Sequence, residues 1–225
     1  MKHPHWAVVV ALLGRLLLST AAAQQAANSP QNAVTAIRAG ALIDGVTNTV
    51  KRDQVIVVRG NRIESIGDAS STKIPPGATV IDLSHSTVLP GLIDCHTHIF
   101  LQGEDPAQGG YDANILTAPL ALRAARATVA VRRALEQGFT TLRDVETEGA
   151  GYGDVGIKEA IEMGYIPGPR LFVATRAIST TGGYPLEGYA PELEMPKGAQ
   201  IVDGPVEARK AAREQLDHGA DWIKV

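Results

Sequence analysis

From Thr87 onward, short apolar runs alternate with stretches of helical spacing, and this alternation constrains the fold more than any other feature. Repeated strand–helix units with buried strands predict an α/β fold with a parallel sheet, either a closed barrel or a doubly wound sheet. Gly138 and Gly219 stand where C-terminal caps of helices belong. The expected strands are Val88–His98, Thr140–Val145, Arg170–Thr175 and Asp221–Val225, and the expected helices are Leu116–Gln137, Val155–Met163 and Val206–His218.

The preceding segment, residues 34–86, has shorter β-type runs separated by turn signals. Asp44-Gly45 and Gly60-Asn61 are dipeptides typical of tight turns. We therefore expect a small β domain with an antiparallel, sandwich-like sheet. Its expected strands contain Ala41–Ile43, Val55–Val58, Arg62–Ile66 and Thr79–Ile81.

The first 23 residues have the composition of a secretory signal peptide. Lys2 supplies a positive charge, Trp6–Leu18 is almost wholly apolar, and Ala21–Ala23 offers a small-residue cleavage site. We expect cleavage there, a linker over residues 24–33, and a secreted or periplasmic protein. An uncleaved amphipathic anchor is the alternative, because Arg15 interrupts the apolar stretch. A stable membrane span is not expected, since the stretch is shorter than the about 20 residues that a spanning helix needs.

The charge balance argues against nucleic acid as a partner. The 225 residues carry a formal net charge of -3, and no run of lysine or arginine interrupts the chain. A groove that follows a phosphate backbone requires such a run. The single cysteine, Cys95, excludes a disulfide within this chain.

Two histidines in the first of the expected parallel strands suggest a metal site. Alternate side chains of a strand share a face, so Asp94, His96 and His98 point one way while Cys95 and Thr97 point the other. Neutral imidazoles that converge at a strand end suit zinc, iron, manganese or cobalt. The alternative is two histidines that are satisfied by ordinary hydrogen bonds.

Four segments of the chain together resemble the imidazolonepropionase-like and prolidase-like (Xaa-Pro dipeptidase-like) branch of the amidohydrolase superfamily. The resemblance covers roughly Val34 to Val225. It implies that residues 87–225 form the first half of a (β/α)8 TIM-like barrel, so that the chain is a fragment of the full-length enzyme. The segments are Val88–His98, Gly138–Asp144, Ile166–Arg170 and Gly219–Lys224.

The resemblance also implies a set of metal ligands. In that family the paired histidines, here His96 and His98, bind one metal, and a carbamylated lysine, here Lys224, bridges two divalent metals, for which we expect zinc. Two further histidines and the catalytic aspartate are expected beyond Val225, so no catalytic residue is assigned within this chain. The implied activity is hydrolysis of an amide-type C–N bond in a dipeptide or cyclic amide by metal-activated hydroxide.

Three further residues complete the sequence hypothesis. Lys224 shares a strand face with Trp222, and a lysine desolvated inside a barrel loses its proton more readily and can take up carbon dioxide. The alternative is a lysine that merely ends a strand. Asp94 is a candidate second-shell group that orients an imidazole, or else a buried hydrogen-bonding carboxylate. Tyr184 lies in a segment that resembles a substrate loop in which better-known members carry histidine, which leaves the substrate class open.

Other features have simpler interpretations. Gly151–Gly156 matches the dinucleotide fingerprint, but Glu146 and Glu148 crowd its approach, so we interpret it as a loop. Cys95 is expected to pack against a barrel helix, and Asp144 to make a cap or loop bond. A non-catalytic exported barrel remnant or binding protein remains the alternative function. For the full-length protein we expect a homo-oligomer that acts on a small molecule or dipeptide.

Overall fold

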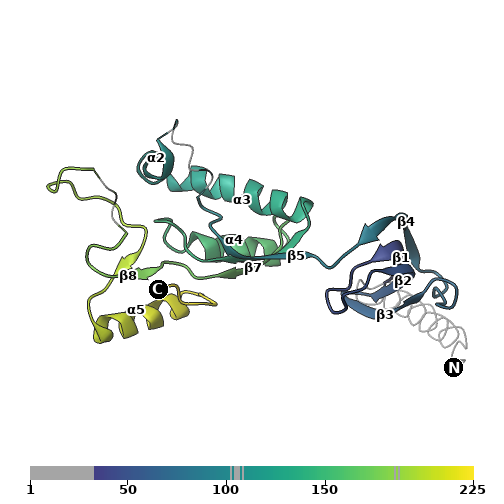
Figure 1. Ribbon diagram of the computed structural model, residues 1–225. Helices are drawn as coiled ribbons and strands as arrows, with labels where there is room; N and C mark the ends of the chain where they lie inside the picture. Colours follow the sequence, from purple (N-terminus) through teal and green to yellow (C-terminus); the bar gives the residue numbers. More distant parts are fainter. Residues whose placement is uncertain (1–32, 102, 104–106, 108, 185, 187) are drawn as a thin grey trace, which may run out of the picture. The chain divides into compact units, whose positions relative to one another are not determined.

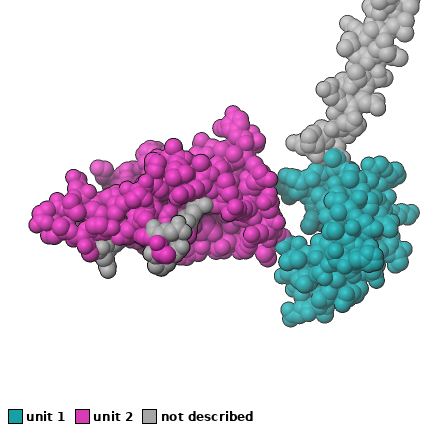
Figure 2. Space-filling view, turned by 90° about the horizontal axis from the view of Figure 1, so that it is seen from above, with its two compact units in different colours: residues 1–90 teal, residues 91–225 magenta. Residues whose placement is uncertain are grey.

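The computed structural model describes residues 33–101, 103, 107, 109–184, 186 and 188–225. The expected signal peptide and nearly all of the expected linker lie outside these residues. The chain divides into two compact units, Met1–Pro90 and Gly91–Val225, which are coloured separately in Figure 2. Each unit is described by itself.

Unit 1 contains one four-stranded sheet with the strand order β3-β2-β1-β4. β1 pairs with β2 and β2 pairs with β3 in antiparallel fashion, whereas β4 runs parallel to β1. The expectation of a purely antiparallel sheet is therefore wrong, because the chain crosses from β3 to the far side of β1 before forming β4. The strands are β1 (Val34–Leu42), β2 (Lys51–Arg59), β3 (Arg62–Asp68) and β4 (Thr79–Val88).

Burial in unit 1 concentrates on the two central strands. Ala36, Val55 and Val57 are almost completely buried. Ile63 on β3 and Val80 on β4 are exposed, although both are apolar. The described part of this unit is a single sheet with a small core along β1 and β2.

Unit 2 is built from parallel strands and helices. Its main sheet has the order β5-β6-β7, with both pairs parallel and consecutive in the sequence. Figure 1 shows α3 and α4 together along one side of this sheet. The elements are β5 (Leu92–Thr97), α2 (Gly110–Thr117), α3 (Leu120–Glu136), β6 (Phe139–Asp144), α4 (Gly153–Glu162), β7 (Arg170–Val173), β8 (Ile178–Ser179), β9 (Gln200–Ile201) and α5 (Pro205–Asp217).

The core of unit 2 lies between the three-stranded sheet and its helices. Phe100, Val131, Leu142, Ile157 and Val173 belong to one buried apolar cluster. These residues come from the strand ends, α3 and α4, so the strand–helix alternation in the sequence is an α/β fold in three dimensions. Among the described residues, no helix has the length and hydrophobicity needed to cross a membrane.

Local chemistry accounts for where several elements begin and end. Gly138 and Gly219 follow α3 and α5 with φ of 92° and 99°, so both glycines terminate helices as expected. The expected helix that started at Leu116 is two helices, because Pro119 interrupts the spacing.

The expected strand Asp221–Val225 is not a regular strand in the structure. The amides of Asp221 and Trp222 both donate to the carbonyl oxygen of Val173, and the carbonyl oxygen of Lys224 accepts from the amide of Ile178. The segment therefore follows the end of β7 without forming a continuous ladder.

Candidate metal site

His96 and His98 lie at the carboxyl end of β5. Their ring centroids are 5.4 Å apart, and the ring planes are inclined by 58°. Between them the hydroxyl of Thr97 donates to the carbonyl oxygen of Arg143 at 3.0 Å, which attaches this end of β5 to β6. The two imidazoles are neighbours, and the intervening side chain is used for strand packing.

One ring nitrogen of His98 faces oxygen atoms of the segment that follows β6. Nδ1 of His98 lies 3.2 Å from the carbonyl oxygen of Glu146 and 3.2 Å from Oε1 of Glu148. Both partners are acceptors, and a neutral imidazole donates from the nitrogen that faces acceptors, which would leave the lone pair on Nε2. A ring in this state presents Nε2 as a metal ligand.

Glu148 is itself held from two directions. Its side chain is 5 % exposed, and its Oε2 accepts a hydrogen bond of 2.6 Å from the hydroxyl of Tyr111 on α2. Desolvation raises the pKa of this Tyr111 hydroxyl, and the Glu148 carboxylate raises it further. The tyrosine therefore remains a hydrogen-bond donor at neutral pH.

A buried arginine on α3 holds the backbone around this site. The guanidinium group of Arg123 donates to the carbonyl oxygens of Phe100 at 3.3 Å, Thr147 at 3.1 Å and Glu148 at 2.7 Å. Arg123 is 4 % exposed. One side chain thus fixes the loop after β5 and the loop after β6 in relation to each other.

Glu146, whose backbone carbonyl oxygen faces His98, is a buried acid. Its residue surface is 0 % exposed, and neither carboxylate oxygen has a hydrogen-bond partner among the described residues. Desolvation raises the pKa of Glu146 to about 7, and the charge of Glu148 contributes to this rise. The nearby hydroxyl of Tyr184 and the charge of Lys224 lower the pKa and so oppose the rise. Tyr184, with a φ of 55°, and Lys224 therefore both lie in the electrostatic surroundings of Glu146.

Lys224 approaches this region from the end of the chain. Its neighbour Trp222 lies under the guanidinium group of Arg143, with 5.2 Å between the guanidinium carbon and the ring centroid. Arg143 also donates to the carbonyl oxygen of Cys95 at 2.7 Å. The structure thus connects the segment that carries Lys224 to the strands that carry the histidines.

Three other residues have contacts that differ in part from the sequence expectations. Asp94 accepts a hydrogen bond from the backbone amide of His96 at 3.0 Å, and no bond from Asp94 to an imidazole occurs among the described residues. Cys95 is exposed, so the expected packing against a helix is wrong; β5 is an edge of the described sheet. Asp144 accepts from the amide of Ile99 at 3.2 Å, which is the expected loop bond.

The donor set fits a divalent transition metal only in part. Within the described residues, no group of three or more histidine, cysteine, aspartate or glutamate side chains is arranged to hold an ion. Imidazole nitrogen is a good zinc ligand, and a catalytic zinc site usually takes three protein ligands. The two histidines therefore suit such a metal, and further ligands are required.

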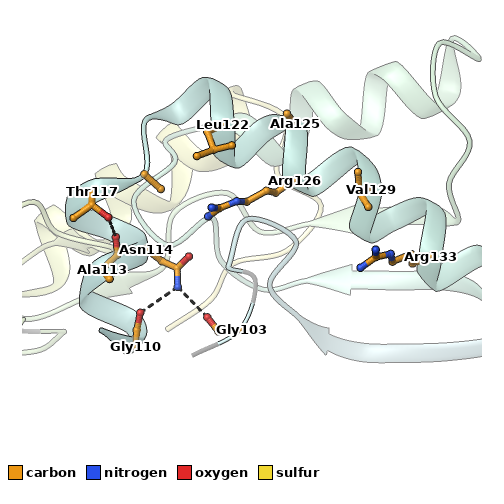
Figure 3. A pocket seen from close by; sticks show the side chains of 11 residues that line it. Gly103, Gly110, Ala113, Asn114, Thr117, Leu122, Ala125, Arg126, Val129 and Arg133 are labelled. Carbon is orange, nitrogen blue, oxygen red and sulfur yellow. Dashed lines mark hydrogen bonds between the residues drawn. The ribbon is translucent and has the colours of Figure 1, made fainter. Parts of the chain in front are cut away.

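A large pocket elsewhere in unit 2 is separate from these residues. Its volume is about 880 Å³, and it lies against α2 and α3, where Asn114, Leu122, Arg126 and Val129 line it (Figure 3). None of the residues that surround His98 lines this pocket. It is not the candidate metal site.

Sequence reasoning missed the residues that hold His98. The sequence indicates Glu146 and Glu148 only as negative charges near a glycine-rich segment, and it gives no indication of a role for Tyr111 or Arg123. A signal for the two glutamates does exist, because both directly follow the strand Phe139–Asp144, at the end where parallel strands place functional groups.

Comparisons with known proteins agree with this architecture. The profile of the amidohydrolase family matches residues 87–225. An ochratoxinase from Aspergillus niger is 32 % identical over 215 residues, which is 88 % of this chain and 43 % of that protein.

Solved structures give the same result. A Xaa-Pro dipeptidase with bound methionine is 34 % identical with a TM-score of 0.74, and the match covers 85 % of this chain and 46 % of the dipeptidase. A prolidase in complex with N-methylphosphonate-L-proline is 31 % identical with a TM-score of 0.72, over 85 % and 46 % of the two chains. The chain thus spans less than half the length of these relatives.

Proposed function

This chain belongs to the amidohydrolase family, and from that premise we propose that the full-length protein hydrolyses an amide-type C–N bond with the help of a divalent metal. Family membership supports hydrolysis of C–N bonds in general. For the substrate we propose a dipeptide or another small amide, because a Xaa-Pro dipeptidase and a prolidase are among the similar structures.

The observation that carries the metal proposal is the state of His98. Nδ1 of His98 faces two oxygen atoms, which leaves Nε2 as the nitrogen that would bind a metal, and the centroid of the His96 ring is 5.4 Å from that of His98. A bound divalent metal would supply a Lewis acid that polarises the scissile carbonyl and lowers the pKa of water.

The residues of this chain have separate tasks in this proposal. His96 and His98 hold the metal, Arg123 keeps the two loops together, and Tyr184 lies where substrate contacts are expected. Protonation of the leaving amine is assigned to the aspartate expected beyond Val225. We further propose two zinc ions, with Lys224 carbamylated as their bridging ligand and Asp94 acting behind the histidines.

Architecture and location complete the proposal. We propose that β5, β6 and β7 are the first strands of a (β/α)8 barrel, since their parallel order is the order in the sequence. We also propose that unit 1 belongs to a sandwich-like domain in the full-length protein, that the full-length protein is a homo-oligomer, and that residues 1–23 direct export.

The central test replaces the histidines in the full-length protein. His96→Ala and His98→Ala should each lose bound zinc, measured by elemental analysis, and lose hydrolysis of Xaa-Pro dipeptides. His85→Ala is a matched control, because His85 is exposed on β4 of unit 1. Equal zinc content in all four proteins would disprove the metal assignment. A full-length original protein that holds no metal would favour the non-catalytic remnant or binding protein.

A second test addresses Lys224. Lys224→Ala in the full-length protein should lose activity and recover part of it when a short carboxylic acid is added, because the acid replaces the carbamate as an anionic oxygen ligand. Lys158→Ala is the control lysine, since its ammonium group pairs with Asp221 at 2.8 Å instead. Full activity of Lys224→Ala without added acid would exclude the carbamate.

A further inference from the structure

We propose that Glu148 is the positioning residue for His98: its carboxylate, anchored by Tyr111, fixes the imidazole in the Nδ1–H tautomer so that Nε2 faces the metal. This inference deepens the proposed function and rests on it for the role of the metal. The tautomer itself is a property of the protein that can be measured without metal or substrate.

The first step of the argument is the geometry at Nδ1. A neutral imidazole carries one proton, and the nitrogen that faces acceptors carries it. The carbonyl of Glu146 and Oε1 of Glu148 both lie 3.2 Å from Nδ1. The carbonyl oxygen of Glu146 is the hydrogen-bond partner of Nδ1, and the Glu148 carboxylate places a negative charge at the same distance, which favours a proton on Nδ1.

The second step is that Glu148 is not free to turn away. Its other oxygen, Oε2, receives the Tyr111 hydroxyl at 2.6 Å, and its backbone carbonyl receives Arg123 at 2.7 Å. The backbone of Glu148 has a φ of 51°, a conformation that costs free energy in any residue with a side chain. The surrounding contacts maintain this conformation, which aims the carboxylate at His98.

The third step is the packing above the carboxylate. A Cβ atom at Gly198 would lie 3.0 Å from the Tyr111 hydroxyl and 3.3 Å from Oε2 of Glu148. A glycine at this position therefore leaves room for the Tyr111–Glu148 hydrogen bond. Carboxylates that accept from a metal-binding histidine raise its basicity and fix its orientation, and their removal typically weakens metal affinity by about 10-fold to 100-fold.

The direct test reads the tautomer of His98 by nuclear magnetic resonance. Full-length, metal-free protein labelled with ¹⁵N-histidine is measured at about pH 8.5, where ordinary imidazoles are neutral, and His98 is assigned by its loss in His98→Ala. We expect the proton on Nδ1. Glu148→Met, which removes both acceptor oxygens at similar size, should populate the Nε2–H form.

Zinc binding, measured by competition with a chromogenic chelator, is the second readout. Glu148→Met should weaken zinc binding by about tenfold or more, Glu148→Gln should recover part of the loss through its remaining oxygen, and the exposed control Glu159→Met should bind like the original protein. Tyr111→Phe keeps the Glu148 carboxylate but removes the hydrogen bond that anchors it, so its zinc affinity should lie between those of the original protein and Glu148→Met. This variant carries the test if Glu148→Met does not fold.

The outcomes separate this inference from the proposed function. A proton on Nε2 of His98 in the original protein would overturn the positioning role, even if the protein is an active hydrolase. Unchanged tautomer and zinc affinity in the folded Glu148→Met variant would do the same. Conversely, an Nδ1–H tautomer that depends on Glu148 in a protein without hydrolase activity would support the positioning role and count against the proposed function alone.

Discussion

Asp154→Asn should remove a pH-dependent loss of stability from unit 2. Asp154 is completely buried at the start of α4, where its Oδ1 accepts from the amide of Val155 at 2.9 Å and its Oδ2 from the amide of Thr175 at 2.8 Å. Desolvation raises the pKa of Asp154 to about 6, and the charge of Asp221 contributes to this rise. The amides of Thr175 and Val155 and its own backbone amide lower the pKa and so oppose the rise. The folded protein thus holds a proton here that the unfolded chain releases.

The sign and size of the effect follow from this difference. Below the ordinary pKa of 3.8, both states are protonated and the stabilisation is fully present. As the pH rises from 3.8 to about 6, only the folded state retains the proton, so the free energy of unfolding falls. The total loss is about 3 kcal/mol, because each pKa unit corresponds to about 1.36 kcal/mol.

Urea unfolding of the full-length protein at several pH values between 4 and 7 measures this loss. Asparagine keeps the size and one acceptor oxygen of Asp154 but does not titrate. The difference in unfolding free energy, Asp154→Asn minus original, should therefore rise by about 2 kcal/mol between pH 4 and 7, which is most of the total. Desolvation and then the charge of Asp154 raise the pKa of the nearby buried Asp144, so part of the difference between the two proteins reports this coupling. A difference that stays constant with pH would refute the reasoning.

Three further predictions concern other parts of the chain. Arg123→Met should lower the free energy of unfolding by about 3 kcal/mol or more, since it leaves three carbonyl groups without their charged donor. Arg132→Met is the control, because Arg132 is exposed, and equal urea midpoints of the two variants would contradict the prediction. Gly153→Ala should lower the free energy of unfolding by about 1–3 kcal/mol, because the new Cβ atom would lie 2.6 Å from the buried Phe100 ring. An unchanged midpoint of thermal unfolding would contradict this prediction and show that the ring moves aside freely. Mass spectrometry of the mature protein should find an N-terminus near Gln24, and retention of Met1 on a membrane-bound chain would identify an anchor instead.

The fold of unit 2 was predictable because its signals are local. Apolar runs of strand length, helical spacing and capping glycines such as Gly138 act within a few residues of the chain. The same local pattern did not predict the pairing of β4, whose partner β1 lies about 45 residues earlier and runs parallel to it. Nothing in the sequence of β4 indicates which neighbour it pairs with or in which direction.

The pair His96 and His98 was also predictable, because alternation along a strand places both side chains on one face. Asp94 shows the limit of that argument. Alternation assigns it to the same face, yet its carboxylate accepts from the amide of His96, and the pairing of β5 with β6 is irregular between Asp94 and Thr97. Alternation decides the side of the sheet, and the final contact of a short side chain depends on which donors lie nearest.

The sequence by itself determined the α/β class of unit 2, the C-terminal ends of α3 and α5 and the pair of imidazoles, all of which depend on residues close together in the chain. Only the tertiary structure decided the surroundings of His98, because Tyr111, Arg123 and Glu148 come from α2, α3 and the loop after β6. Hydrogen bonds between such distant residues require a donor and an acceptor to meet within about 3 Å, a condition that the packed fold imposes and sequence spacing does not reveal.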